Sequence, residues 1–424
     1  MESERPATAA RPLRIAWLGS SPLDTGGAPG VVTELLEGLA ALGHQIDCFF
    51  PGAGQLLPER FNTMENLTIV WGASGWRWDR WYSRTKLAAF ASGLIARAGG
   101  SLRLRREIVR RHRRTPYDLV YQNSTIESLA VPGALVRSVP LVIRPDTHIA
   151  GELRWLLAER RLALACQPRR MFLAAVAVMS VRALVQRVRI RRASLVICIS
   201  RAFREHLVHD YRVVRARTVV VPNPVRLERF AVRARPVGQP ATVLVLGRIS
   251  VRKGVEDVVA LAHELLRRGV EARIRVVGGP SLWSDYTPLL SELPRENAEY
   301  VGRIRPAEIP DELARSDILL QASKYEPFGL TVAEALAAGV AVVATSEVGA
   351  IEDVRRPVVE VVAPGDVAGM ASALTHMLAR LRADPGALRA GARAEAERLF
   401  STAVVCRQIS DALERLVAGS GLDA

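Results

Sequence analysis

Short apolar runs alternate with amphipathic segments through the first half of the chain. Residues 13–19, LRIAWLG, predict a buried strand, and a glycine-rich turn at 24–30 leads into an amphipathic helix over 31–43. The next apolar run, HQIDCFF at 44–50, predicts a second strand. Strand, loop, helix and strand in this order are typical of βαβ units in a parallel sheet. Further strands are predicted at 117–123, 140–146, 193–200 and 217–225.

A second series of the same kind begins after the Pro- and Gly-rich stretch RARPVGQPA at 233–241. Its strands are predicted at 241–247, 272–280, 298–304, 317–323 and 341–345, and helices at 254–268, 306–315 and 330–338 alternate with them. We therefore predict an α/β fold of two doubly wound, Rossmann-like domains that face each other across a cleft. Ligands bind such sheets at the loops that follow the carboxyl ends of the strands.

The predicted organisation has five parts. They are a disordered N-terminus (1–12), an acceptor-side domain (13–230), a linker (231–241), a donor domain (242–400) and a C-terminal helix (401–424). We expect this last helix to pack back on the N-terminal domain. A chain of 424 residues is long enough for two hydrophobic cores.

The chain is strongly basic, with a net charge of +15. Arginine carries almost all of the positive charge, because the sequence contains only three lysines. A bias toward arginine codons accounts for the total but not for the clustering of arginines at 97–114 and 154–192. Such clusters favour an anionic partner: a membrane surface, a phosphate-bearing acceptor or a nucleic acid. Sparse aromatic residues (5%) and the absence of a recognised binding motif argue against nucleic acid.

Residues 171–181, MFLAAVAVMSV, form the longest apolar run, which is too short to span a bilayer. We favour a buried helix here, and the alternative is a helix that lies on a membrane. No secretory signal follows the polar N-terminus, and Cys48, Cys166, Cys198 and Cys406 lack metal-binding spacing. We therefore expect reduced thiols in a cytoplasmic protein, held peripherally at the inner membrane face if the arginine clusters bind lipid.

The segment 323–345, SKYEPFGLTVAEALAAGVAVVAT, carries the most specific chemistry. A strand ends near Ser323, Glu326 lies in the following loop, and a helix begins near Leu330 with Glu334 one turn in. The first turn of a helix offers free N–H groups and the positive end of its dipole to a phosphate. A carboxylate one turn further along can accept hydrogen bonds from the two hydroxyls of a ribose.

The spacing from Glu326 to Glu334 resembles the E-x7-E motif of retaining GT-B glycosyltransferases, especially family 4. GRISVRKG at 247–254 and VPNPVRLERF at 221–230 resemble two further motifs of that family, with Pro224 in place of the commoner glycine. GGAPGVVTELLEGLAALGHQI at 26–46 is similar to its N-terminal glycine loop and helix.

The resemblance implies a nucleotide-sugar site in the C-terminal half. Arg248 and Lys253 would hold the donor diphosphate, as two cations at the end of a strand can. Glu334 would bind the ribose and Glu326 the transferred sugar. The remaining donor-binding residues would be Phe328, Gly329 and Leu330 through backbone amides, Arg303 and Ile304 at the nucleobase, and Gly27 beside the phosphates. The resemblance implies no metal ion and no cofactor.

The acceptor side matches the family less well. A histidine commonly follows the strand at 140–146 in family 4, whereas this chain has Asp146 at that place and His148 two residues later. Either side chain could approach the donor sugar.

These residues predict a retaining glycosyltransferase that moves a sugar from a nucleotide-diphosphate sugar to a glycan, a lipid-linked acceptor or a small molecule. Cell-surface polysaccharide or glycolipid synthesis is the expected setting. The alternatives are a nucleotide-sugar epimerase with the same fold and an inactive glycosyltransferase-like scaffold. The presence of Arg248, Lys253, Glu326 and Glu334 argues against loss of activity.

Overall fold

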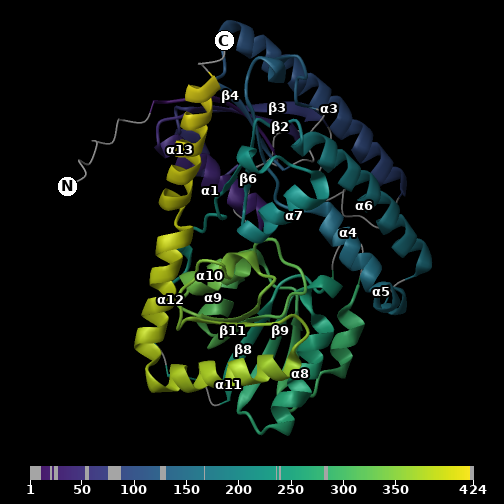
Figure 1. Ribbon diagram of the computed structural model, residues 1–424, viewed down its shortest axis with the longest axis vertical. Coiled ribbons are helices and arrows are strands. Elements are labelled where there is room, and N and C mark those ends of the chain that lie inside the picture. Colours follow the sequence, from purple (N-terminus) through teal and green to yellow (C-terminus); the bar gives the residue numbers. More distant parts are fainter. Residues whose placement is uncertain are drawn as a thin grey trace, which may run out of the picture.

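Two parallel β-sheets organise the computed structural model, one in each half of the chain (Figure 1). The structure describes residues 11–19, 22, 27–52, 57–74, 87–124, 130–166, 168–234, 236–237, 240–280 and 285–420. The predicted disordered N-terminus therefore lies almost wholly outside the described residues. The predicted α/β fold, with one Rossmann-like parallel sheet in each half, is confirmed.

The N-terminal sheet has seven strands in the order β3-β2-β1-β4-β5-β6-β7. Their bounds are β1 Arg14–Leu18, β2 Gln45–Gly52, β3 Leu67–Ser74, β4 Leu119–Asn123, β5 Leu141–Arg144, β6 Leu195–Cys198 and β7 Thr218–Val220. The C-terminal sheet has six strands in the order β10-β9-β8-β11-β12-β13. Their bounds are β8 Ala241–Leu246, β9 Ala272–Val277, β10 Ala298–Gly302, β11 Ile318–Gln321, β12 Ala341–Thr345 and β13 Val359–Val362.

The strand order reverses direction between β1 and β4 in the first sheet and between β8 and β11 in the second. At such a point the loops leaving two neighbouring strands turn to opposite faces and open a crevice at the carboxyl edge. β8 and β11 pair in parallel through Val243 with Ile318 and Leu244 with Leu319, so their following loops lie next to each other.

Helices cover both faces of each sheet (Figure 1). In the N-terminal domain they are α1 Ala28–Ala41, α3 Leu87–Arg114, α4 Ile149–Ala158, α5 Arg160–Cys166, α6 Arg169–Ile190 and α7 Arg201–Tyr211. The second series contains α8 Val255–Arg267, α9 Ile309–Ala314, α10 Leu330–Ala337, α11 Val367–Ala383, α12 Pro385–Phe400 and α13 Thr402–Ser420.

The last helix, α13, returns to the N-terminal domain and packs along α1 (Figure 1). Val405, Cys406, Ile409 and Leu413 are buried in the same apolar cluster as the β1 and α1 side chains. A side chain at Gly38 of α1 would collide with the Cys406 sulfur, so the two helices approach as closely as glycine permits.

Two strands were not predicted from the sequence, β3 and β13, and both lie at an edge of their sheet. An edge strand is partly exposed and does not need a continuous apolar run. In β13 only Val359 is buried, whereas the central strand β12 is buried throughout.

The preference for a buried helix at 171–181 was wrong. This segment lies in α6, where Phe172, Ala175, Met179 and Ile190 face the domain but Leu173, Val181 and Leu184 are each more than 60% exposed. By length and composition alone, α6 is apolar enough to cross a membrane. Among the described residues it is the one helix with that property.

Candidate active site

The loop that follows β8 carries two of the predicted donor-binding cations. Gly254 ends this loop in the left-handed conformation (φ 66°) as the N-cap of α8, and a side chain there would collide with the carbonyl oxygen of Ala322 beyond β11. Only glycine therefore allows the loop to lie against the end of β11. Arg248, which is exposed, and Lys253, which is half-buried, line one small pocket at these strand ends.

Lys253 and Glu326 were predicted from separate motifs, and they form an ion pair through Nζ and Oε2. Arg252 Nη1 lies 3.1 Å from the same carboxylate oxygen. Burial alone would raise the pKa of Glu326, but the charges of Lys253, Arg252 and Arg248 lower it to about 2. Glu326 is therefore a permanently ionised acceptor of hydrogen bonds.

α10 begins directly after this loop. Gly329 caps it with φ 92°, and a side chain there would lie 2.8 Å from Val348, so the sharp entry to the helix depends on glycine. Phe328 is buried against Phe400 with ring centroids 5.8 Å apart, which fixes the loop to α12. The first N–H groups of α10, which begin at Leu330, have no acceptor within the helix and carry the positive end of its dipole.

Glu334 lies in the second turn of α10 and is 6% exposed. Burial raises the pKa of its carboxyl to about 7, although the charge of Arg229 acts in the opposite direction. A buried carboxylate without a cation in contact is costly, and such residues are concentrated at functional sites.

Asp146 is held on the N-terminal side of the site by a buried arginine. Arg144 is completely buried, donates to Asn223 Oδ1 (2.6 Å) and to the Pro222 carbonyl (3.2 Å), and lies 3.6 Å from Asp146 Oδ1. Burial raises the pKa of Asp146 to about 6 against the charge of Arg144. The VPNP turn at 221–224 thus fixes Arg144, which in turn fixes Asp146, whose side chain keeps 21% exposure.

His148 lies inside the contact between the two domains. It is completely buried, its Nδ1 is 2.7 Å from Tyr325 Oη, and its Nε2 is 3.1 Å from Asp210. Burial lowers its pKa to about 4 despite the neighbouring carboxylate, so the ring is neutral at neutral pH. Asp146, not His148, therefore has surface free to meet a ligand.

Further contacts join the domains around Glu326. Arg252 Nη2 lies 3.5 Å from Glu152 of α4, and Ser200 donates a 2.8 Å hydrogen bond to the carbonyl of Pro327. Arg252 therefore connects the carboxylate of Glu326 in one domain with helix α4 of the other.

The other predicted residues lie outside this set of ion pairs. Arg303 is exposed and Ile304 half-buried just after β10, next to Gly279 beyond the neighbouring strand β9. Gly27 is the exposed N-cap of α1 with φ 77°, and residues 23–26 of its loop lie outside the described residues. No group of three or more metal-ligating side chains occurs among the described residues.

The sequence reasoning missed Arg252, Glu152, Arg144 and Asn223. Asn223 and Arg252 lie inside recognised motifs, but no spacing rule assigns them a partner. Their partners come from other parts of the chain, up to 100 residues away for the Arg252–Glu152 pair, and only the folded structure brings them together.

Comparison with known proteins gives matches over both domains. Residues 25–229 match the family described as Glycosyltransferase Family 4, and residues 228–387 match Glycosyl transferases group 1. Glycogen synthase of Mycobacterium tuberculosis is 31% identical over 219 residues, which are 50% of this chain and 51% of that protein. Mannosylfructose-phosphate synthase of Agrobacterium fabrum is 27% identical over 173 residues, covering 37% and 38%. The chain thus spans about half or less of the length of these relatives.

Solved structures share the whole fold. Sucrose-phosphate synthase of Thermosynechococcus elongatus superposes with a TM-score of 0.66 at 20% identity, over 96% of this chain and 100% of that one. HepE of Anabaena, in complex with UDP-glucose, gives a TM-score of 0.63 at 17% identity over 95% and 100%. The two family matches together cover residues 25–387, and the chain accordingly belongs to the family 4 glycosyltransferases with the GT-B fold.

Proposed function

We propose that this chain transfers a sugar from a nucleotide-diphosphate sugar to an acceptor with retention of the anomeric configuration. The observation that carries the proposal is the meeting of Lys253 and Glu326, 73 residues apart, at the strand ends beside the first turn of α10. Lys253, a cation that can bind a phosphate, therefore lies next to Glu326, an ionised carboxylate that can accept hydrogen bonds from sugar hydroxyls.

Negative charge grows on the departing diphosphate as the glycosidic bond breaks. Arg248, Lys253 and the N-terminus of α10 provide positive charge to meet it, in the role that a metal ion has in other transferases. Because the pKa of Glu326 is about 2, this residue accepts hydrogen bonds from the donor sugar and does not act as a proton donor. Glu334 would bind the ribose, and Arg303 with Ile304 the nucleobase.

On the acceptor side, Asp146 would contact the donor sugar and the acceptor hydroxyl would attack from the face that the diphosphate leaves. The leaving phosphate takes the proton of that hydroxyl. Contacts such as Arg252 with Glu152 would keep the two domains together and exclude water during transfer.

The first donor to test is a UDP-sugar, because the similar HepE structure holds UDP-glucose. We propose a glycan or lipid-linked acceptor used in cell-surface polysaccharide or glycolipid synthesis. The enzyme would work in the cytoplasm at the inner face of the membrane.

The test is a thermal-shift screen of the full chain against UDP-, GDP- and ADP-sugars. One donor should stabilise the protein, and Lys253→Ala or Glu334→Ala should remove the stabilisation. Nucleotide release that requires an added acceptor supports transfer, whereas conversion of the donor without an acceptor supports an epimerase. Full stabilisation in both variants would refute this donor site.

A further inference from the structure

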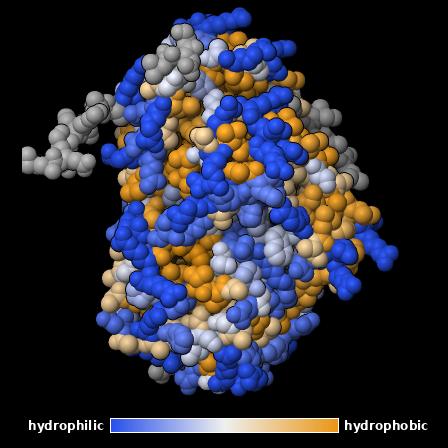
Figure 2. Space-filling model, in the orientation of Figure 1, coloured by the Kyte–Doolittle hydropathy of each residue, from blue (hydrophilic) through white to orange (hydrophobic). Residues whose placement is uncertain are grey.

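The outward side of α6 is apolar, the reverse of a usual surface helix. Each exposed aliphatic residue lies three, four or eight positions from another along the helix, which places them on one side of it. The apolar stripe comprises Leu173, Val181, Leu184, Val185 and Val188. Figure 2 shows apolar side chains gathered at this edge of the molecule, over α5 and the adjoining part of α6.

The apolar stripe continues toward the active site. Leu157 of α4 and Leu164 of α5 are 40% and 39% exposed, and α4 packs against α6. α4 itself begins immediately after His148, at the contact between the domains. The apolar surface therefore extends from α6 to the helix that supplies Glu152 to the interdomain contact.

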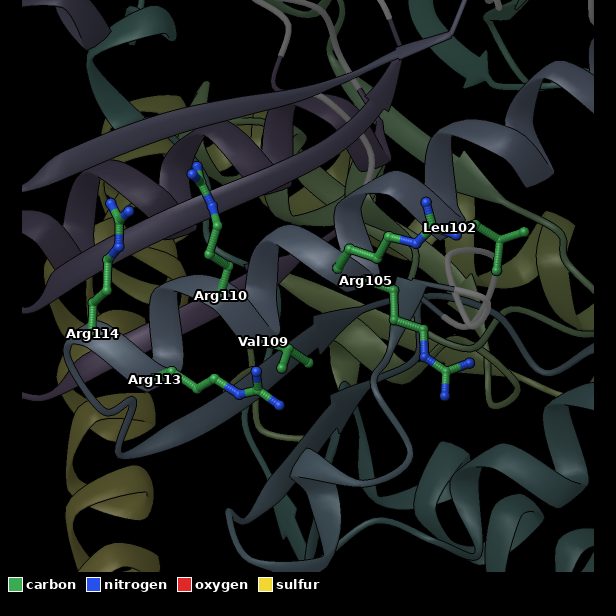
Figure 3. A pocket seen from close by; sticks show the side chains of 7 residues that line it. Leu102, Arg105, Val109, Arg110, Arg113 and Arg114 are labelled. Carbon is green, nitrogen blue, oxygen red and sulfur yellow. The ribbon is translucent and has the colours of Figure 1, made fainter.

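Helix α3 carries a row of arginines, one of which, Arg105, lies close enough to Arg189 at the C-terminal end of α6 to affect its charge. A pocket along this helix is lined by Leu102, Arg105, Arg106, Val109, Arg110, Arg113 and Arg114. Arg110, Arg113 and Arg114 fan out from its last turns (Figure 3). Of the arginines that line this pocket, Arg110 pairs with Glu107.

The C-terminal end of α6 joins this basic surface. Burial lowers the pKa of Arg189, and the nearby charges of Arg192 and of Arg105 on α3 lower it further. α6 contains no acidic residue, and α3 contains one, Glu107. The apolar stripe therefore lies beside a concentration of positive charge that few carboxylates of the described residues neutralise.

We propose that this surface, the apolar stripe of α6 with the arginines of α3, docks on an anionic lipid bilayer. Aliphatic side chains beside guanidinium groups match the boundary between acyl chains and phosphate headgroups. A protein partner would instead have to supply both an apolar groove and a dense cluster of acidic side chains. α6 lies in the plane of the interface, because Phe172, Met179 and Ile190 hold its other side against the domain. The docking does not depend on the donor chemistry. Only its consequence, that the acceptor arrives along the membrane surface, rests on the proposed function.

The test is sedimentation of the full chain with vesicles of phosphatidylcholine alone or mixed with phosphatidylglycerol. We expect binding to the anionic vesicles that weakens with added salt. Leu173→Glu/Leu184→Glu should reduce the partition coefficient at least about tenfold, since both residues would enter the acyl boundary. Arg106→Ala/Arg113→Ala should reduce it about 25-fold, because each arginine near the surface contributes about fivefold.

Matched controls carry the same changes elsewhere. Leu266→Glu/Val361→Glu alters two aliphatic residues of the C-terminal domain that are each 41% exposed. Arg407→Ala/Arg415→Ala removes two exposed arginines of α13. Both controls should bind vesicles as the parent chain does.

The unfolding temperature of every variant establishes that the changes act on docking and not on folding. The donor-induced thermal shift is measured in parallel, so that a failure of the proposed enzymatic function is recognised separately. Absence of binding to anionic vesicles would overturn the docking proposal. The proposal would also be overturned if both surface variants still bound anionic vesicles as the parent chain does, because the membrane contact would then lie elsewhere.

Discussion

Replacing Glu334 by Gln should make the protein more stable and its donor binding weaker. The carboxyl of Glu334 is buried, and its pKa of about 7 lies well above the ordinary value of 4.5. The difference corresponds to roughly 3 kcal/mol of unfolding free energy, which the protein loses when this group ionises. Glutamine has nearly the shape of the protonated carboxyl and does not ionise, so the variant avoids this loss of stability.

The sign of the pH effect follows from proton binding. Between the unfolded and folded pKa values the folded chain binds the proton more tightly, so the parent protein loses stability as the pH rises from about 4.5 to 7. Glu334→Gln should therefore match the parent near pH 4.5 and exceed its free energy of unfolding by up to about 3 kcal/mol at pH 8.

Donor binding should change in the opposite direction. An ionised carboxylate accepts two hydrogen bonds from a ribose diol, and losing a charged hydrogen bond costs about 1.5–3 kcal/mol, so the affinity should fall roughly 10- to 150-fold at pH 8. In the parent protein, protonation of Glu334 should weaken donor binding by about tenfold from pH 8 to pH 6.

Urea denaturation without ligand and titration calorimetry with the donor, each at several pH values, measure the two quantities. Glu334→Asp is a control that keeps the charge. If Glu334→Gln is less stable than the parent at pH 8, or binds the donor equally well, the reasoning about this carboxyl is wrong.

Three further changes test the rest of the site. Lys253→Ala should weaken donor binding about 10- to 100-fold in calorimetry by removing a phosphate contact. Glu152→Gln should lower kcat while leaving donor affinity within about twofold, because its carboxylate lies against Arg252 across the domain contact and is not among the residues proposed to bind the donor. Gly254→Ala should cost about 1–3 kcal/mol from the left-handed backbone alone, seen as a lower urea midpoint.

Each of these changes has a result that would contradict its prediction. Unchanged calorimetry in Lys253→Ala would place the diphosphate elsewhere, and an unchanged kcat in Glu152→Gln would remove the role of the domain contact. A Gly254→Ala protein as stable as the parent would show that the loop can leave the end of β11. Lys253→Ala also removes a charge that lowers the pKa of Glu326. As the pH falls from 4.5 toward 2, the unfolding free energy of this variant should therefore decrease less than that of the parent.

The arrangement of the candidate donor residues was largely predictable from the sequence because their positions depend on local structure. Glu326, Gly329 and Glu334 follow one another along a strand, loop and helix, and Lys253 lies in the loop after the neighbouring strand. The parallel order of β8 and β11 alone brings these two loops together. Motifs whose geometry depends on a few neighbouring residues can be recognised in a sequence.

The acceptor side and α6 were less predictable because their environments come from distant segments. His148 lies two residues beyond the place where the family commonly has its histidine, and Tyr325 and Asp210 enclose it in the domain contact. The apolar run at 171–181 has the composition of a core helix, and only the folded arrangement shows that no other described element covers its outer side. Composition reports how apolar a helix is, not what lies beside it.

The return of α13 to α1 affects how this protein could be recombined with its relatives. A crossover placed only in the segment between the sheets would separate the N-terminal sheet from Val405, Cys406 and Ile409, which complete its apolar cluster. It would also separate His44 from Ser410, whose side chains are 2.8 Å apart. Chimeras that exchange the C-terminal domain should therefore have two breakpoints, the second just before Thr402, so that the N-terminal domain and α13 come from the same parent.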